Sequence, residues 1–235
     1  YSFLQFNRDT MTEVALIDHN GEGEATANIQ LCTAHWYGGN REQSCENTVK
    51  SVKKLLGGIQ IDGYYELNMS EIPKLNSMVD GVTVTLEDDF SKKYPKMKKG
   101  ATINLDDEQA YAYVHDRYGV GDEENTSRMK RQQQYMTGFF KKLQEKVKAN
   151  PNYANEVFES LQDVSTTDIA IGKISNISNI FASGTDKGIF ELAGKSKIGQ
   201  ALGDEMDHME FYVNKKAMVS TMSELFGIVE QKNKE

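Results

Sequence analysis

The feature that most constrains this chain is one long amphipathic segment from Thr126 to Ala149, which Asn150 and Pro151 terminate. Its apolar residues recur at the three- and four-residue spacing of a single helix face. They are Met136, Phe139, Phe140, Leu143 and Val147. The opposite face is polar, so the segment predicts a long helix with one side packed on a core.

Shorter apolar patterns on either side of this helix alternate between two kinds. Alternating residues predict strands at 1–8, 63–69, 82–86, 188–193 and 208–213. Three- to four-residue spacing predicts helices at 46–56, 70–79, 107–114 and 167–181, with Ile174, Ile177 and Ile180 inward in the last, and a final helix after Asn214. This interleaving predicts an α/β fold with a central mixed β-sheet flanked by helices.

The chain has 235 residues, which suffice for one sizeable core, and no linker divides it. We therefore expect a single domain over residues 1–235. No apolar run is long enough to span a bilayer. The sequence opens inside a predicted strand, Ser2 to Phe6, so we expect that a segment upstream of residue 1, including the first strand region, is missing.

The charge of the chain bears on its partners. The formal net charge is -8 and the pI is about 5.2, which argues against nonspecific nucleic-acid binding because that needs a basic face. Lysines are nevertheless concentrated in one predicted polar loop, from Asp88 to Gly100.

The strongest candidate site lies at the start of the long helix. Arg128, Arg131 and Gln132 are spaced three and four apart, so their side chains share one helix face. They fall in the first turns, where unpaired N–H groups and the helix dipole favour an anion. Two guanidinium groups and an amide there suit a phosphate or pyrophosphate. The alternative is a solvated basic face.

Three weaker signals accompany it. Arg8-Asp9-Thr10 follows a predicted strand, where ligands collect in α/β sheets, although a loop ion pair fits as well. His115-Asp116-Arg117 closes a predicted short helix, where the helix dipole alone could explain a His and an Arg. Asp122, Glu123 and Glu124 could hold Mg²⁺, orient a guanidinium or accept a proton, or simply face solvent.

Other chemical signals are absent from the sequence. It contains no G-x-S-x-G and no P-loop, and its four histidines lack zinc-site spacing. Cys32 and Cys45 are near enough in sequence for a disulfide closing a short loop, but two separate thiols fit equally well.

Taken in order, these segments resemble the LytR-CpsA-Psr family of extracytoplasmic bacterial enzymes. The matching segments are Arg8-Asp9-Thr10, Ala34 to Gly39, Ile61 to Tyr64, Val79 to Val82, Ala110 to Arg117 and Arg128 to Gln132. Two positions depart from the family pattern: His115 replaces the first of two paired arginines, and Asn125 stands where the family has an acid. Asp122 or Glu124 could replace that acid through a shift of the loop.

The resemblance implies a phosphotransferase that moves a glycopolymer from a polyprenyl-pyrophosphate lipid to peptidoglycan and forms a phosphodiester, with pyrophosphatase activity as a further expectation. It implies a site that contains Arg8, Asp9, Arg117, Asp122, Arg128, Arg131 and Gln132. An apolar groove, lined in part by the Phe139 helix, would hold the prenyl chain.

The resemblance also implies a setting. The family is anchored outside the cell by one N-terminal transmembrane helix, which we expect upstream of residue 1, and that compartment favours a Cys32–Cys45 disulfide. Mg²⁺ is the implied cofactor, with its main aspartates also expected upstream. Two alternatives stay open: a non-catalytic module that binds polyprenyl-pyrophosphate or wall glycopolymer, and a transcriptional attenuator, against which the acidic charge argues.

Overall fold

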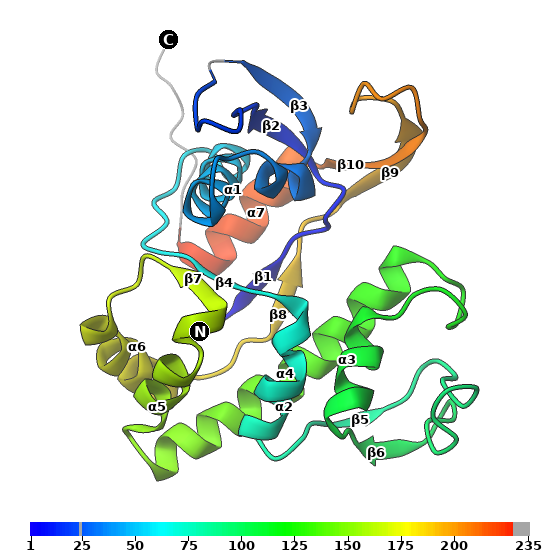
Figure 1. The fold of residues 1–235 in the computed structure, drawn as a ribbon, viewed down its shortest axis with the longest axis vertical. Coiled ribbons are helices and arrows are strands. Elements are labelled where there is room, and N and C mark those ends of the chain that lie inside the picture. The colour runs from blue at the N-terminus through cyan, green and yellow to red at the C-terminus, as the bar shows by residue number, and fades with distance from the viewer. Residues whose placement is uncertain (24, 228–235) are drawn as a thin grey trace. The chain divides into compact units, whose positions relative to one another are not determined.

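The computed structural model describes residues 1–23 and 25–227, in which helices and short strands alternate (Figure 1). The helices are α1 Arg41–Leu55, α2 Ile72–Met78, α3 Asp107–His115, α4 Asn125–Ala149, α5 Tyr153–Ser160, α6 Ile171–Ser183 and α7 Lys215–Phe226, with three 3-10 helices, η1 Leu31–Trp36, η2 Met69–Glu71 and η3 Gln162–Val164. The strands are β1 Phe3–Gln5, β2 Met11–Ala15, β3 Thr26–Gln30, β4 Tyr65–Leu67, β5 Thr83–Thr85, β6 Thr102–Asn104, β7 Ser165–Thr167, β8 Ile189–Glu191, β9 Gly194–Gly199 and β10 His208–Val213. The predicted α/β class is confirmed.

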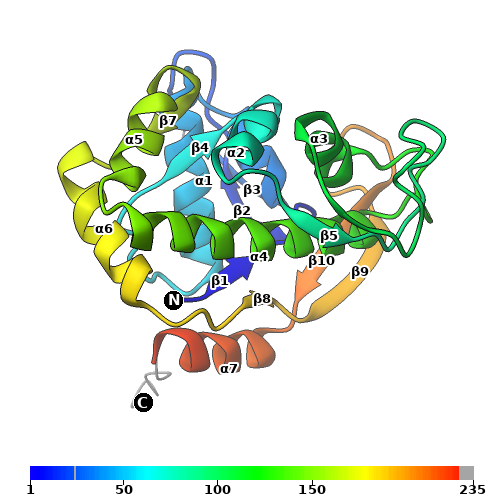
Figure 2. The ribbon, with the colours of Figure 1, turned by 90° about the horizontal axis from the view of Figure 1, so that it is seen from below.

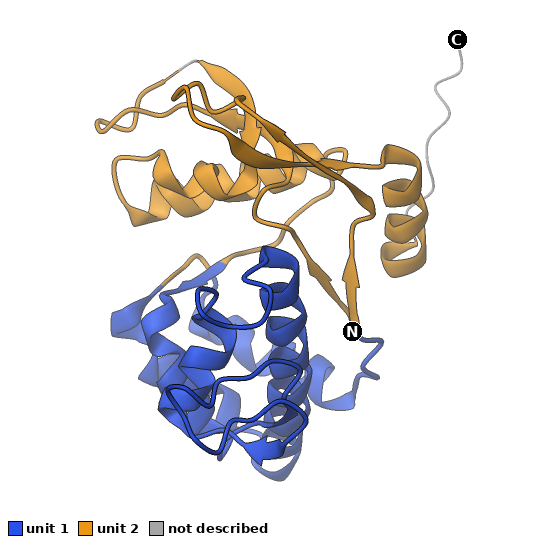
Figure 3. Ribbon diagram, turned by 90° about the vertical axis from the view of Figure 1, so that its right-hand side faces the viewer, with its two compact units in different colours: residues 1, 65–165, 169–188 blue, residues 2–64, 166–168, 189–235 orange. Residues whose placement is uncertain are grey.

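The chain forms two compact units, coloured separately in Figure 3. Unit 1 contains residue 1 and residues 65–165 and 169–188, and unit 2 contains residues 2–64, 166–168 and 189–235. That residues 1–235 act as one domain stays a prediction. No helix in the described residues is long and apolar enough to cross a membrane.

The strands of the described residues pair two by two. β1 and β8 are parallel, whereas the β2–β3, β5–β6 and β9–β10 pairs are antiparallel. Both orientations of the expected mixed sheet are therefore present, but each sheet has two strands. Most strands are three to five residues long, which limits each to a few ladder hydrogen bonds.

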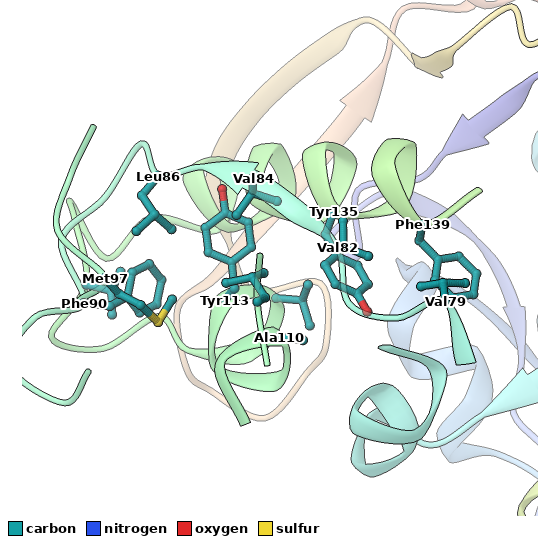
Figure 4. Close-up of a cluster of buried hydrophobic side chains, with 13 residues drawn as sticks. Val79, Val82, Val84, Leu86, Phe90, Met97, Ala110, Tyr113, Tyr135 and Phe139 are labelled. Atoms are coloured by element: carbon teal, nitrogen blue, oxygen red, sulfur yellow. The ribbon is translucent and has the colours of Figure 1, made fainter. Parts of the chain in front are cut away.

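Unit 1 is built around α4, which Figure 2 shows along its length with α3 and β5 beside it. Its core gathers buried side chains from α3, α4, the β5 segment and the loop that follows it (Figure 4). Labelled members are Val79, Val82, Val84, Leu86, Phe90, Met97, Ala110, Tyr113, Tyr135 and Phe139. The predicted apolar stripe of α4 thus faces a core, with Phe139 inside it.

The close approach of α4 to β5 explains a glycine in the middle of this helix. Gly138 costs about 1 kcal/mol relative to alanine in a helix interior. A Cβ atom at Gly138 would lie 2.6 Å from Cγ1 of Val82, which is too close for packed carbon atoms. Glycine at this position therefore lowers the helix propensity of α4 but lets the helix pack closely against Val82.

Unit 2 packs α1 against the β2–β3 hairpin and η1. Asn47 of α1 is fully buried and donates from Nδ2 to the carbonyl oxygens of Ala15 and Ala34, each at 2.9 Å. One amide therefore ties α1 to β2 and to η1. A second apolar cluster joins Leu56 to Leu192 and to Met222 of α7.

The structure corrects one predicted helix face. α6 forms where a helix was predicted, but Ile177 and Ile180 are 48% and 62% exposed rather than inward. The small side chain of Ser178 is buried instead, because α6 is rotated about its axis relative to the predicted face. The sequence patterns also missed the short elements β2, β3, β6, β7, β9 and α5.

Candidate functional site

The predicted arginine site falls on one corner of unit 1, where α3 ends and α4 begins. Asp106 caps α3 by accepting from the Gln109 backbone N–H at 2.9 Å, and the Gln109 side chain returns a bond to the Asp106 backbone. This capping box fixes the start of α3. The helix ends at His115, and the loop at 116–124 connects it to α4.

Arg131 is the buried centre of this corner, with 2% of its surface exposed. Its Nη1 donates to Oδ2 of Asp88 at 2.5 Å and its Nε to the Tyr113 carbonyl oxygen at 3.0 Å. Its Nη2 donates to the Asp116 carbonyl oxygen, and the guanidinium lies 5.4 Å from the ring centroid of Phe90. Every nitrogen of the guanidinium is thus engaged by protein, which ties α4 to α3 and to the loop after β5.

Two neighbouring side chains reinforce this junction. Gln132 donates from Nε2 to the Val114 carbonyl oxygen at 3.0 Å, one residue along α3 from the Tyr113 carbonyl oxygen that Arg131 contacts. Tyr113 is fully buried and donates its hydroxyl proton to Gln134 of α4, and burial, aided by the nearby Glu87 charge, raises its pKa. Gln132 therefore holds the two helices together, as Arg131 does.

Arg128 lies in the first turn of α4, as predicted, and is partly exposed. Its Nη2 donates to Oδ1 of Asn125 at 2.6 Å. Asn125, which departs from the family pattern, thus still offers the arginine an oxygen, but a neutral one. This contact orients the guanidinium beside the helix N-terminus.

Asp122 organises the loop that leads into α4. Its Oδ1 accepts from the Glu124 backbone N–H at 2.9 Å and its Oδ2 accepts from the Ser127 hydroxyl at 2.8 Å. These bonds hold the pKa of Asp122 below its usual range. Asp122 is therefore ionised at neutral pH, and both of its carboxylate oxygens accept hydrogen bonds at the start of α4.

Arg117 is on the same loop and is partly exposed. Its guanidinium carbon lies 4.5 Å from the ring centroid of Tyr118, and its Nη2 donates to the Tyr118 hydroxyl. His115 stacks on Tyr111 with 4.7 Å between centroids and lies 3.1 Å from Oδ1 of Asp116. His115 thus packs along its own helix, in the place of an arginine.

Arg8 and Asp9 belong to unit 2, where Arg8 is exposed and its Nε lies 3.5 Å from Oδ1 of Asp9. The Asp9 carbonyl oxygen accepts from the Phe211 backbone N–H at 2.7 Å, which fixes this turn beside β10. The predicted convergence of Arg8 with the arginines of unit 1 stays a prediction.

The predicted Cys32–Cys45 disulfide is not present. The structure holds two separate thiols, because each sulfur is directed to a different side chain. Cys32 Sγ accepts from Arg8 Nη2 at 3.7 Å, whereas Cys45 Sγ lies 3.8 Å from His35 Nε2. Burial raises the pKa of Cys32, although the Arg8 charge acts in the opposite direction.

Sequence reasoning missed Asp88, which it placed in a polar loop. The signal was indirect: a buried arginine needs a carboxylate, and the Asp88-Asp89 pair directly follows a predicted strand. The spacing of Arg128 and Arg131 predicts that they share one helix face. On that face the structure encloses Arg131 and leaves Arg128 partly exposed.

The acids of this corner do not form a magnesium site by themselves. Asp88 pairs with Arg131, Asp116 with Lys93 at 3.5 Å, and Asp122 starts α4. Among the described residues of either unit taken alone, no three His, Cys, Asp or Glu side chains lie close enough to share an ion. The Mg²⁺ that the resemblance implies stays a prediction.

Unit 1 also has an open cavity of about 500 Å³ between α2 and the start of α3. Polar and acidic residues line most of it, among them Asn76, Asp80, Asp106 and Asp107. It does not have the character of the predicted prenyl groove, since a prenyl chain needs an apolar wall. That groove stays a prediction.

Comparison with known proteins gives a consistent result. The model of the LytR_cpsA_psr family matches residues 1–226. A transcriptional regulator from Enterococcus faecalis is 19% identical, with a TM-score of 0.70 over 98% of this chain and 78% of that one. Among curated proteins, none matches.

Two further solved structures have the same fold. TagV from Bacillus subtilis is 19% identical, with a TM-score of 0.68 over 97% of this chain and 84% of that chain. A structure described as TagT bound to LI-WTA is 19% identical, with a TM-score of 0.68 over 96% of this chain and 78% of that one. At this identity the likeness shows a common fold.

Proposed function

This chain belongs to the LytR-CpsA-Psr family, and from that premise we propose that it is a phosphotransferase of cell wall assembly. It would move a glycopolymer from a polyprenyl-pyrophosphate carrier to peptidoglycan outside the cell and form a phosphodiester. The family and its solved members support transfer of cell wall glycopolymers in general. The donor lipid, the acceptor, pyrophosphatase activity and a membrane anchor belong to the proposal.

The observation that carries this proposal is the arrangement of arginines around the start of α4. The three guanidinium nitrogens of Arg131 all make contacts that hold α3, α4 and the loop at Asp88 together. Arg117 and Arg128 stay partly exposed on the corner that it holds, beside a helix end that favours anions. We therefore assign Arg117 and Arg128 to the pyrophosphate, with Arg8 as a further donor, and assign Arg131 and Gln132 as positioning residues.

The chemistry follows from where charge develops. A peptidoglycan hydroxyl attacks the phosphorus that carries the glycopolymer, and the new P–O bond forms as the bond to polyprenyl phosphate breaks. Negative charge grows on the leaving phosphate, where Arg117 and Arg128 stabilise it. The hydroxyl proton needs an acceptor. Asp122 is a poor one because its lowered pKa makes it a weak base. We therefore propose as acceptor Asp9, the other acid that the family resemblance implies for the site.

A transfer assay tests this function. The protein is incubated with a short-chain prenyl-pyrophosphate disaccharide and peptidoglycan, with Mg²⁺ or with a chelator. We expect prenyl monophosphate and a glycan phosphodiester, with formation slowed in Asp9→Asn much more than in Asp122→Asn. Intact donor after prolonged incubation with wild-type protein and Mg²⁺ would reject the enzymatic proposal.

A binding module is the second candidate, because His115 and Asn125 replace charged family residues. His115 packs on Tyr111, and Asn125 offers Arg128 a neutral oxygen. Saturable binding of the same donor without any product would favour this candidate. A transcriptional role is tested by titrating DNA at several salt concentrations. The net charge of -8 leads us to expect no specific complex.

A further inference from the structure

The loop between α3 and α4 displays one large aromatic ring that the proposed function does not use. Tyr118 is 76% exposed, and it directly follows Arg117, the arginine assigned to the pyrophosphate. Small polar residues and glycine dominate surface turns, and an exposed ring leaves apolar surface in water. Tyrosine and arginine are the residue types enriched where proteins contact their partners. An exposed ring beside this arginine therefore favours contact with a ligand.

A closed turn holds Tyr118 in place. The Val120 backbone N–H donates to the Arg117 carbonyl oxygen at 3.3 Å, which closes a four-residue turn with Tyr118 and Gly119 at its tip. Gly119 has a φ of +75°, a conformation that glycine adopts without strain. Its N–H donates to Oε1 of Glu123 at 2.8 Å, and the Glu123 N–H donates to the Val120 carbonyl oxygen at 3.1 Å. Hydrogen bonds therefore define the backbone on both sides of the ring.

The same turn is anchored to unit 1. The Val120 side chain is 7% exposed and belongs to the apolar cluster that contains Phe139 of α4. Just before the turn, the Asp116 carbonyl oxygen accepts from Nη2 of Arg131. Tyr118 is therefore displayed from a loop that is fixed to α4 beside the candidate site, so that little ordering of the loop is needed when a ligand binds.

The guanidinium of Arg117 lies on the ring of Tyr118. The guanidinium carbon is 4.5 Å from the ring centroid, and Nη2 donates to the Tyr118 hydroxyl. These contacts occupy the hydroxyl and one face of the ring. Because the residue is 76% exposed, the other face is open to solvent. The pair thus presents a cation and an aromatic surface side by side.

The proposed donor has two parts that match this pair. Its pyrophosphate is bonded directly to a sugar, so one oxygen atom separates the anion from a pyranose ring. The C–H bonds of a pyranose form an apolar face, which can pack on an aromatic ring. Neighbouring residues can contact both parts, because consecutive Cα atoms are about 3.8 Å apart.

We propose that Tyr118 binds the sugar that carries the pyrophosphate, by stacking on its ring, while Arg117 binds the phosphates. This inference rests on the proposed function and adds a substrate-binding residue to it. Among the tyrosines of residues 107–124, Tyr111 stacks on His115 and Tyr113 is buried, whereas Tyr118 has an open face. Tyr118 is therefore the tyrosine of this corner that fits the task.

The test compares three variants on two ligands. Tyr118→Ala removes the ring, Tyr118→Phe keeps the ring without the hydroxyl bond to Arg117, and Tyr118→Trp offers a larger ring. The ligands are the short-chain prenyl-pyrophosphate disaccharide and farnesyl pyrophosphate, which has no sugar. Affinities are measured by calorimetry. Thermal midpoints should stay close to wild type, because the side chain is exposed.

We expect Tyr118→Ala to lose roughly five- to tenfold in affinity for the disaccharide but to stay within about twofold of wild type for farnesyl pyrophosphate. Tyr118→Phe and Tyr118→Trp should bind the disaccharide within about twofold of wild type, because both keep an aromatic face. An equal loss for both ligands in Tyr118→Ala and in Tyr118→Phe would show that Tyr118 acts only by holding Arg117. Unchanged disaccharide affinity in Tyr118→Ala would equally overturn the inference.

A fluorescence measurement tests the contact itself. Trp36 is the single tryptophan of the chain and is 62% exposed, so the double variant W36F/Y118W carries its single tryptophan at position 118. We expect saturating disaccharide to shift the emission to shorter wavelength more than farnesyl pyrophosphate does, because stacking removes the indole from water. Equal shifts with the two ligands would contradict a sugar contact.

The same ligands separate this inference from the proposed function. If wild-type protein binds the disaccharide through the ring of Tyr118 but forms no product, the transferase proposal fails while the sugar contact stands. If wild-type protein forms product but binds the disaccharide no more tightly than farnesyl pyrophosphate, the transferase proposal stands and the sugar contact is wrong.

Discussion

Buried Arg131 of α4 and half-buried Asp88 form an ion pair at 2.5 Å, while the neighbouring arginine of α4, Arg128, is left partly exposed. The pair closes the junction between α4 and the loop that joins β5 to β6. Arg128 and Arg131 lie three positions apart in sequence, and this pair gives them different roles. Arg131 stabilises the corner, whereas Arg128 is the arginine that the proposed function assigns to the pyrophosphate.

Removing Arg131 should therefore cost stability. Replacing it with methionine keeps the apolar stem but leaves Asp88 and two backbone carbonyl oxygens without a donor. We expect a loss of about 3–5 kcal/mol in the free energy of unfolding, which urea denaturation measures. The double variant R131M/D88N should recover part of it, because the unpaired charge is gone. Unchanged stability with lost transfer would show instead that Arg131 contacts the substrate.

Arg128 should show the opposite behaviour. Arg128→Ala removes a charged guanidinium from the site but retains helix propensity. The free energy of unfolding should therefore change by less than about 1 kcal/mol. Transfer of a short-chain prenyl-pyrophosphate glycan should slow by roughly a hundredfold or more, because a contact that strengthens in the transition state is lost.

Arg128→Lys is the matched control. It should restore only part of the turnover, since an ammonium cannot reproduce the two-pronged contact of a guanidinium. Thermal midpoints are measured for both variants. Full turnover in Arg128→Ala would remove this residue from the site, and a collapsed midpoint would make it structural.

The long helix and the class of the fold could be predicted from the sequence because their signals are local. The stripe from Met136 to Val147 has helical spacing, and Asn214 and Asp106 cap α7 and α3 as their residue types predict. The pairing of short strands could not be predicted, because β6 and β9 have few apolar residues and owe their place to a partner strand.

For the candidate site, the sequence predicts which residues share a helix face but not which contacts they make. The spacing of Arg128, Arg131 and Gln132 gives one helix face, yet which part of that face is covered depends on α3 and on Asp88, far away in sequence. The prediction of which face of α6 is buried was wrong for the same reason. Ile177 and Ile180 have the spacing of a buried face, and only the packing of the folded chain decides otherwise.

Asn76 should be a stability residue at the edge of the acidic cavity. It is 1% exposed, and its Oδ1 accepts from the Val82 backbone N–H and the Tyr135 hydroxyl, each at 3.2 Å. Its Nδ2 donates to the Leu105 carbonyl oxygen at 3.0 Å and to Asp107 at 2.9 Å. Asn76→Ala should cost about 2–4 kcal/mol in chemical denaturation, because buried partners lose their bonds. Tyr135→Phe, which removes one of these bonds, should cost about 1 kcal/mol, and an equal loss in both variants would contradict this ranking.

Glu210 should make the stability of unit 2 depend on pH. It is 2% exposed on β10, and its carboxylate accepts from the Tyr212 hydroxyl at 2.7 Å and the Ala201 backbone N–H at 2.9 Å. These bonds hold the pKa of Glu210 below its ordinary value of 4.5. A pKa that is lower in the folded chain than in the unfolded chain means that the ionised form stabilises the fold. That stabilisation is present at pH values above the pKa of the unfolded chain and is lost as the pH falls through the pKa of the folded chain.

Glu210→Gln should therefore lower the thermal midpoint at pH 7, and the difference in midpoint from wild type should narrow as the pH is taken below 4.5. Asp207→Asn, on the exposed loop before β10, is the control and should leave the gap near zero throughout. A constant gap between wild type and Glu210→Gln from neutral to acid pH would show that the glutamate acts through its shape and not through its charge.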